Sequence, residues 1–174
     1  AHRAHVRSLE EYQRQYRLSI DDPEGFWQKQ AEILTWFHPP QQIFDADLRE
    51  VDFSWYGGGR LNACHNCVDR HLATRGDKPA ILWAGDEPGD YRSITYRELK
   101  HMVCRIANVL LAHGVTKGDR VALYMPMIPE LAATMLACAR IGAVHSVVFA
   151  GFSAESLRGR ILDAGAKLVV TANE

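Results

Sequence analysis

The sequence lacks several features that would place the protein in a functional class at once. No window holds the roughly 18 apolar residues that a membrane-spanning helix requires. Neither sign of charge predominates, because 20 lysines and arginines are balanced by 21 aspartates and glutamates, and this balance disfavours binding to nucleic acid. The patterns GxxxxGK[ST] and GxGxxG are both absent, so neither a P-loop nor a dinucleotide-binding fingerprint is predicted.

Cysteine is also scarce, with four residues in a chain of 174. Few cysteines in a chain of this size favour reduced thiols over disulfides. The sequence begins Ala1-His2-Arg3 and shows no signal-peptide pattern. Together these features predict a cytoplasmic protein.

What is present divides into two unlike parts that meet near residue 60. The first part is expected to form short helices joined by irregular chain. Ser8 and Glu11 have the spacing of a capping box at the start of one helix. A second helix is predicted with Asp22 as its N-cap, Pro23 at its first position and an apolar stripe that continues to Phe37.

Aromatic residues are concentrated in this first part. Ten of the 16 tryptophans, tyrosines and phenylalanines lie in the first 56 positions, with little aliphatic material to pack against them. Such a segment is expected to lie over a larger body, with its aromatic side chains as anchors. The alternative is a poorly ordered tail, which the aromatic density disfavours.

The second part alternates between apolar strands and helices. Strands are predicted at residues 80–86, 91–96, 120–125, 144–149 and 167–172, and helices at 96–113, 129–142 and 154–165. The pattern predicts an α/β fold, in which a helical and irregular N-terminal extension precedes the first βα units of a doubly wound, largely parallel sheet covered on both faces. The sequence stops at Glu174, directly after a strand, which predicts a truncated sheet.

The stretch LNACHNCVDRH, residues 61–71, contains the cluster that most resembles a metal site. Cys64, Cys67 and His71 follow at i, i+3 and i+7 among apolar residues of helical period, and Gly76 is a suitable C-terminal cap. On a helix these three side chains form one stripe, whereas zinc requires about four ligands placed tetrahedrally. No second cysteine or histidine pair in the sequence would complete such a site. We therefore predict a helix with core contacts and no metal site.

Two loops are candidates for contact with a ligand. Residues 56–61, YGGGRL, are expected to form a loop in which only glycine fits. After the strand that ends at Phe149, the small residues Ala150 and Gly151 make a turn, and Ser153 begins a helix. Because this turn is free of bulky side chains and leads into a helix N-terminus, a ligand could approach its backbone closely. Every βα unit has such a turn, so the feature alone is weak.

Several strings together resemble the AMP-forming acetyl-CoA synthetase family. The resemblance covers nearly the whole chain from about Leu9 onward. It is carried by SIDDPEGFW, WYGGGRLNACHNCVDRHL, RGDKPAILWAGDEPGD, ITYRELKHMVCRIAN, GVTKGDRVALYMPMIPELAATMLACARIGAVHSVVFAGFS and RILDAGAKLVVTANE.

The resemblance implies an adenylate-forming ligase of which this chain is the front quarter. Such an enzyme converts acetate and ATP, with Mg²⁺, to acetyl-adenylate and pyrophosphate, and CoA then displaces AMP. Residues 1–65 correspond to the N-terminal extension of the family and residues 66–174 to the beginning of its AMP-binding domain. The implied partners are acetate, ATP, CoA and the remainder of the chain, with no nucleic acid and no membrane. The catalytic motifs lie downstream, so no catalytic residue is predicted here and the isolated chain is expected to be inactive.

The resemblance places one functional element in this chain. Phe149, Ala150 and Gly151 correspond to the segment that lines the pocket for the adenine of CoA. The family often has two glycines at the positions of Ala150 and Gly151, so the alanine is a mild departure that would tighten the pocket. Neither ATP nor CoA is expected to bind tightly to the isolated chain.

Two alternatives remain open at this stage. The first is a propionyl-CoA or other short-chain acyl-CoA synthetase, because the acyl pocket is not in this sequence. The second is a stand-alone nucleotide-binding or regulatory module with half of a Rossmann-like sheet. The absence of GxGxxG and the end of the sequence directly after a strand disfavour the second.

Overall fold

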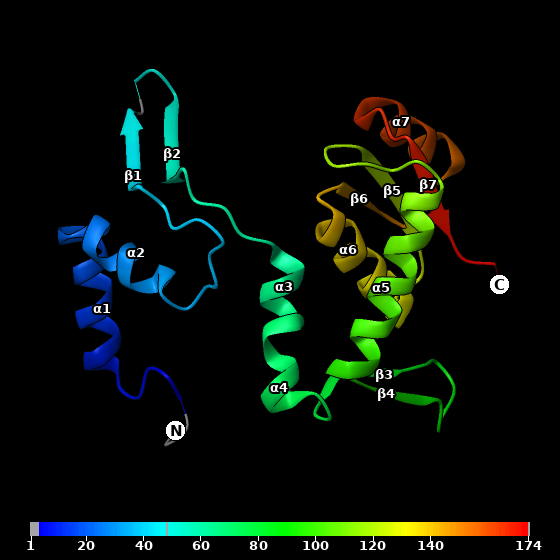
Figure 1. Cartoon of the computed structure of the whole chain (residues 1–174), viewed down its shortest axis with the longest axis horizontal. Coiled ribbons are helices and arrows are strands. Elements are labelled where there is room, and N and C mark those ends of the chain that lie inside the picture. The colour runs from blue at the N-terminus through cyan, green and yellow to red at the C-terminus, as the bar shows by residue number, and fades with distance from the viewer. Residues whose placement is uncertain (1–3, 48, 174) are drawn as a thin grey trace. The chain divides into compact units, whose positions relative to one another are not determined.

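The computed structural model describes residues 4–47 and 49–173 of the chain. The chain divides into two compact units, unit 1 at Ala1–Leu61 and unit 2 at Asn62–Glu174, and their elements are labelled in Figure 1. In the described part, no helix is both long enough and apolar enough to cross a membrane.

Unit 1 begins with two helices, α1 at Leu9–Asp21 and α2 at Pro23–Ala31. Ser8 caps α1, because its hydroxyl accepts a hydrogen bond from the Glu11 amide at 3.1 Å. The other half of the predicted capping box is wrong, since the Glu11 carboxylate accepts from the Arg7 amide at 2.9 Å instead. Asp22 caps α2 as predicted, by accepting from the Gly25 amide at 3.0 Å.

Helix α2 is shorter than predicted and ends at Ala31 rather than near Phe37. The cause is a side chain that binds a main-chain carbonyl at the end of the helix. The indole nitrogen of Trp36 donates to the Ala31 carbonyl at 2.9 Å, an oxygen that a continuing helix would use for the amide four residues on. The apolar stripe therefore runs past the helix into a turn.

A β-hairpin follows, although irregular chain was predicted there. Strands β1, Gln42–Asp47, and β2, Asp52–Gly57, pair antiparallel with Phe44 opposite Trp55. These two rings are 4.3 Å apart, and the Trp55 ring lies 5.6 Å from that of Trp27. Such cross-strand aromatic pairs stabilise a hairpin whose sequence alternation is weak.

The predicted glycine loop is confirmed at two of its three glycines. Gly58 has a φ of +75°, a backbone conformation that favours glycine. A β-carbon on Gly59 would lie 2.7 Å from the ring of Trp36, so a side chain does not fit there. Gly57 belongs to the end of β2.

Unit 2 opens with three short helical segments, α3 at Ala63–Cys67, a 3-10 turn at Asp69–His71 and α4 at Leu72–Arg75. An antiparallel hairpin of β3, Pro79–Ala84, and β4, Tyr91–Thr95, follows as predicted. Helix α5, Tyr96–Ala112, then begins with a complete capping box between Thr95 and Glu98 and is followed by Gly114 at a φ of +79°. Both features were predicted.

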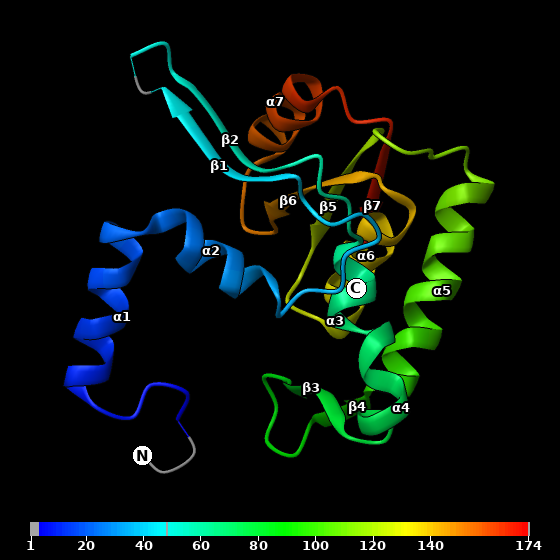
Figure 2. The same ribbon diagram turned by 60° about the vertical axis from the view of Figure 1, so that its left-hand side comes forward.

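The parallel sheet consists of β5 (Arg120–Met125), β6 (Val144–Phe149) and β7 (Leu168–Thr171), in the order β6-β5-β7. Helix α6, Pro129–Ile141, connects β5 to β6, and α7, Ala154–Ala164, connects β6 to β7. Figures 1 and 2 show α7 on the face of this sheet opposite to α5 and α6. The predicted doubly wound α/β arrangement is confirmed in unit 2.

The core of unit 2 lies between the sheet, α5 and α6. Alternate residues of the central strand β5 enter it, with Val121 and Leu123 fully buried. They pack against Val103 of α5 and Ala137 of α6, both of which are also fully buried. Since successive side chains of a strand point to opposite faces, Tyr124 of β5 projects towards α7 instead.

Candidate functional site

The cysteine-containing stretch folds differently from the prediction. The helix breaks at Val68, where φ is −124° and ψ is −63°, so Cys64, Cys67 and His71 do not form one stripe. Cys64 is completely buried, whereas Cys67 is exposed. Gly76 has a φ of −52° and is not a left-handed cap; the Arg97 guanidinium packs closely against it instead.

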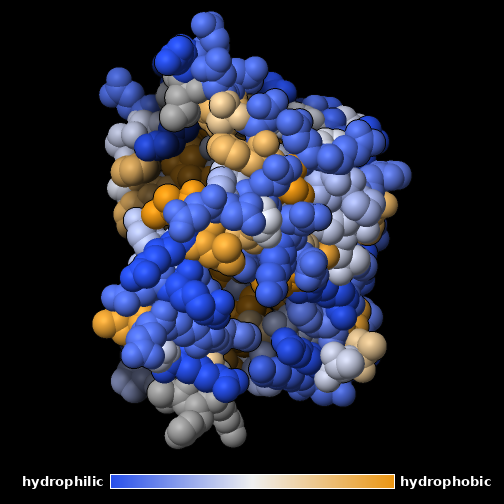
Figure 3. All heavy atoms as spheres, turned by 90° about the vertical axis from the view of Figure 1, so that its left-hand side faces the viewer, coloured by the Kyte–Doolittle hydropathy of each residue, from blue (hydrophilic) through white to orange (hydrophobic). Residues whose placement is uncertain are grey.

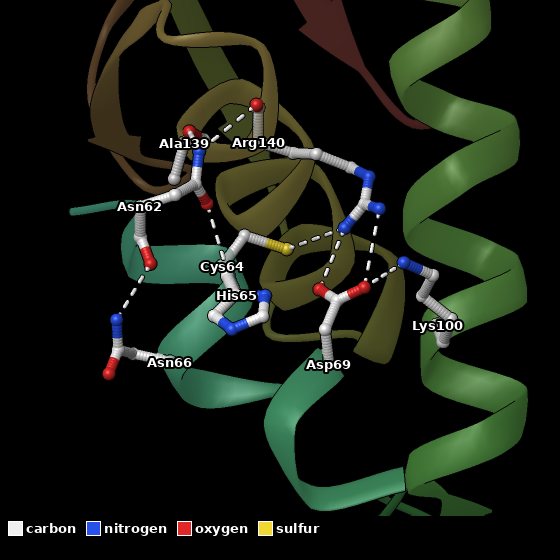
Figure 4. Close-up of polar contacts among 8 residues, drawn as sticks. All are labelled: Asn62, Cys64, His65, Asn66, Asp69, Lys100, Ala139 and Arg140. Atoms are coloured by element: carbon white, nitrogen blue, oxygen red, sulfur yellow. Dashed lines mark hydrogen bonds and ion pairs between the residues drawn. The ribbon is translucent and has the colours of Figure 1, made fainter. Parts of the chain in front are cut away.

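Cys64 lies beside a cluster of charged residues that joins three helical elements (Figure 4). Asp69 accepts two hydrogen bonds from the guanidinium of Arg140, at 2.8 and 3.3 Å, and forms an ion pair with Lys100. The same guanidinium lies 3.6 Å from the Cys64 sulfur. Asn62 donates to the Ala139 carbonyl at 3.0 Å and so ties the start of unit 2 to the end of α6.

The electrostatics of this cluster make the thiol inert. Burial raises the pKa of Cys64 and outweighs the opposing effect of Arg140, so the thiol stays protonated. Burial alone would also raise the pKa of Asp69, but the hydrogen bonds and charges of Arg140 and Lys100 outweigh it and lower that pKa. In the part of the chain that is described, no three His, Cys, Asp or Glu residues are grouped so that they could hold a metal ion. The cluster has a structural role, because Asp69 links the 3-10 turn to Lys100 of α5 and Arg140 of α6.

The turn between β6 and α7 has the geometry of a binding surface. Phe149 is 65% exposed at the end of β6, and its ring packs edge to face with that of Phe152 at 5.8 Å. The Phe152 amide donates to the Phe149 carbonyl at 3.1 Å and closes a four-residue turn. A β-carbon on Gly151 would lie 2.7 Å from the Phe149 ring. The absence of a side chain at Gly151 therefore lets the ring lie across the turn.

This turn lines an open cavity of about 1050 Å³. Its other walls are the segment that links β5 to α6 and the end of the β3–β4 hairpin. The residues that line it are Trp83, Ala84, Gly85, Asp86, Glu87, Asp90, Met125, Pro126, Met127, Ile128, Leu131, Val147, Val148, Phe149, Ala150 and Gly151.

Contacts of Trp83 and Arg92 attach the β3–β4 hairpin to the segment that follows β5. The Trp83 indole donates to the Met127 carbonyl at 2.7 Å, and the Arg92 guanidinium lies 4.4 Å from the centre of the Trp83 ring. Arg92 also pairs with Glu130 at 3.0 Å. The hairpin is thereby attached to the segment after β5, and the cavity is held by elements on two sides.

The chemistry of the cavity suits a flat, uncharged group. Apolar surface is supplied by Phe149 and by Met127, which is 78% exposed. Its charged residues are carboxylates of the hairpin at Asp86, Glu87 and Asp90, which would repel phosphate. The cavity therefore offers a surface for a ring, and its lining has no lysine, arginine or histidine that could bind a phosphate.

The structure brings the three predicted site residues together at the edge of this cavity. It adds Trp83 and Tyr124, which the sequence reasoning missed. Tyr124 hydrogen-bonds to the turn from the neighbouring strand β5. A tyrosine in an otherwise aliphatic central strand is the signal that could have drawn attention to it, because its hydroxyl requires a partner.

Comparison with known proteins assigns this chain to a family. The sequence profile described as "AMP-binding enzyme" matches residues 68–174, more than half of the chain. The chain belongs to the AMP-binding enzyme family. A second profile, described as "Acetyl-coenzyme A synthetase N-terminus", matches residues 12–67 of the chain.

Curated relatives match the chain over nearly its whole length. "Acetyl-coenzyme A synthetase 2" of Pseudomonas aeruginosa is 57% identical over 166 residues, which cover 95% of this chain and 26% of the relative. "Acetyl-coenzyme A synthetase" of Syntrophobacter fumaroxidans is 56% identical, with the same shares covered. The protein of that name from Alkalilimnicola ehrlichii is 51% identical over 99% of this chain and 27% of its own length. The chain thus spans about a quarter of the length of these relatives.

Proposed function

We propose that this chain is the N-terminal part of an acetate–CoA ligase. The ligase would join acetate to the α-phosphate of ATP, release pyrophosphate, and transfer the acetyl group of the adenylate to the thiol of CoA with release of AMP. The observation that carries the proposal is the identity of 51–57% with relatives that are all named acetyl-coenzyme A synthetase. We further propose that residues 1–65 are the extension and residues 66–174 the start of the AMP-binding domain.

The chemistry of the adenylation step would lie outside this chain. The lining of the cavity at the β6–α7 turn contains no basic side chain, and the described residues contain no group of three or more His, Cys, Asp or Glu that could hold a metal ion. The isolated 174-residue chain should therefore not exchange labelled pyrophosphate into ATP. In the full-length protein, exchange should depend on acetate. Stronger exchange with propionate than with acetate would assign the protein to the propionyl-CoA alternative.

The remainder of the chain is the proposed partner of a second surface in unit 2. A groove of about 730 Å³ runs between α5, α6 and β7 and is lined largely by apolar side chains. Strand β7 is at the edge of the sheet and pairs only with β5 among the described strands. Further residues of the longer protein would cover this groove and edge. Slower amide exchange of β7 in the full-length protein than in the 174-residue chain would support this arrangement.

The proposed role of Phe149, Ala150 and Gly151 is to bind the adenine of CoA. The exposed Phe149 ring offers an apolar surface, and Gly151 leaves the space in which that ring lies across the turn. Contact between a base and an aromatic side chain contributes about 1–3 kcal/mol, or roughly five- to 150-fold in affinity.

The test is to separate the two half-reactions in the full-length protein. Phe149→Ala removes the apolar surface, and Gly151→Leu both fills the space and displaces the Phe149 ring. Both changes should raise the KM for CoA, and the leucine should have the larger effect. Acetate-dependent exchange of pyrophosphate into ATP should persist, because the adenylate forms without CoA. Equal loss of both half-reactions in a folded variant would refute the CoA site. A cytoplasmic location remains a prediction.

A further inference from the structure

The hydroxyl of Tyr124 contacts the main chain of the β6–α7 turn. It donates to the carbonyl of Ala150 at 2.7 Å, and the carbonyl of Phe152 lies 3.2 Å away. A hydroxyl carries one proton, so the shorter contact is the principal hydrogen bond. Tyr124 is part of β5, the strand that pairs with both of its neighbours. The hydroxyl is therefore a fixed anchor on a rigid strand.

The hydrogen bond acts on the one peptide of the turn whose orientation is otherwise free. The turn is closed by the bond from the Phe152 amide to the Phe149 carbonyl. That bond forms in type I and in type II turns, which differ by a rotation of about 180° of the central peptide. The central peptide here joins Ala150 to Gly151, and its carbonyl is the one that Tyr124 binds.

Glycine makes both orientations of this peptide accessible. A type II turn requires a φ near +80° at its third residue, where glycine is the preferred residue. Gly151 occupies that position, but its φ is not in the positive range. The turn is therefore not type II, although the residue present would permit it. The contact from Tyr124 to the Ala150 carbonyl opposes the rotation.

The orientation of this peptide decides where a backbone donor points. In a trans peptide the N–H is directed opposite to the C=O, so the Gly151 N–H points away from the Tyr124 hydroxyl. It has no acceptor among residues 4–47 and 49–173. Gly151 lines the cavity described above. A free donor next to the exposed Phe149 ring matches a ligand that combines an aromatic face with a ring-nitrogen acceptor.

We propose that Tyr124 is a positioning residue for the adenine of CoA, which orients the Ala150–Gly151 peptide so that the Gly151 N–H donates to a ring nitrogen of the base. The inference rests on the proposed CoA site. It adds that the site uses a directed hydrogen bond in addition to the apolar contact, and that a residue outside the cavity controls it.

The experiment compares Tyr124→Phe with the wild type in the full-length protein. Loss of one hydrogen bond should raise the KM for CoA about two- to tenfold. Pantetheine, which has the thiol arm of CoA but no adenine, should react equally well with both proteins. Exchange of pyrophosphate into ATP should be unchanged. The matched control is Tyr56→Phe, because the Tyr56 hydroxyl also donates to a main-chain carbonyl, that of Trp27, at 3.1 Å; its KM for CoA should equal that of the wild type.

Each outcome decides between the possibilities. A raised KM for CoA with unchanged use of pantetheine supports the positioning role. If Tyr124→Phe lowers the reactions with CoA and pantetheine, and the exchange, to the same extent, Tyr124 only stabilises the fold and the inference is wrong. If Tyr124→Phe equals the wild type while Phe149→Ala raises the KM for CoA, the positioning role fails and the CoA site stands. If Phe149→Ala and Gly151→Leu both leave the KM for CoA unchanged, the CoA site itself fails.

Discussion

The two units of this chain use apolar residues in opposite ways. Unit 2 gathers aliphatic side chains into one core in which Leu110, Leu123 and Val103 are almost completely buried. In the described residues of unit 1, the buried apolar side chains are those of Ala31 and Ile43. Apolar side chains reach the surface among hydrophilic ones on the face shown in Figure 3. A high aromatic content therefore does not by itself produce a core.

The difference follows from the spacing of the apolar residues. In unit 2 they recur at helical or strand period, so whole elements present one apolar face to the same interior. In unit 1 the rings pack against one another in pairs, such as Phe26 with Trp27 at 5.2 Å and Tyr12 with Tyr16 at 6.2 Å. Each such pair contributes about 0.5–1.5 kcal/mol. In the described part of unit 1, these pairs are accompanied by few buried aliphatic side chains.

The largest expected difference between the units comes from removing a large aliphatic side chain. Leu123→Ala should lower the free energy of unfolding by about 2–5 kcal/mol, because it leaves a cavity in a fully packed site. Leu9→Ala, at a side chain that is 69% exposed, should change it by less than about 0.5 kcal/mol. Urea unfolding of the 174-residue chain measures both. A loss of similar size for the two variants would contradict the division into one cored and one uncored unit.

Disruption of the charged cluster of Asp69, Lys100 and Arg140 should give the next largest effect. Asp69→Asn leaves the cations of Lys100 and Arg140 without their shared partner in a partly buried site, where the Asp69 side chain is 16% exposed. We expect a loss of about 1–3 kcal/mol. The control is Asp77→Asn, which removes a carboxylate that is 90% exposed and pairs with Arg97; it should cost less than about 1 kcal/mol. Thermal unfolding of both variants tests this. Equal melting temperatures would show that the cluster of Asp69, Lys100 and Arg140 stabilises the fold no more than an exposed ion pair does.

Removal of a helix cap from each unit should have a smaller effect on stability. Thr95→Ala removes the capping box of α5 and should cost about 1 kcal/mol of unit 2 stability. Ser8→Ala removes the cap of α1 and should speed amide exchange in that helix alone. Hydrogen exchange resolved by residue distinguishes these results. If Ser8→Ala also lowered the protection of α5 or β5, the units would be more strongly coupled than their separate packing indicates.

The smallest expected effect concerns a loop carboxylate and depends on pH. Asp119 accepts hydrogen bonds from Lys167 at 2.9 Å and from the Thr116 amide at 2.7 Å, which lower its pKa to about 2. Because the pKa is depressed on folding, this stabilisation is present above about pH 4 and is lost as the pH falls towards 2. Asp119→Asn should therefore destabilise the chain at pH 7 more than at pH 2. Urea unfolding at the two pH values measures the difference, and an equal effect at both would show that the ionised carboxylate is not the stabilising form.

Local sequence determined most of unit 2. The strands at 120–125 and 144–149 and the helix from Pro129 to Gly142 were predicted nearly to the residue. Periodicity, N-caps and terminal glycines act over three or four residues, so they are visible without knowledge of the fold. The candidate turn at Phe149–Gly151 was located in the same way, as small residues between a strand and a helix.

Tertiary structure decided what depends on residues far apart in the sequence. The β1–β2 hairpin forms through aromatic contacts across its strands and with Trp27, and the helix of the cysteine stretch breaks at Val68. The ion pairs of Asp69 with Arg140 join residues 71 positions apart, and the hydrogen bond from Tyr124 to Ala150 joins residues 26 apart. The sequence alone predicts the position of the turn, but only the fold brings the Tyr124 hydroxyl to it. The reason is that the contact depends on the register between β5 and β6, which neither local sequence pattern specifies.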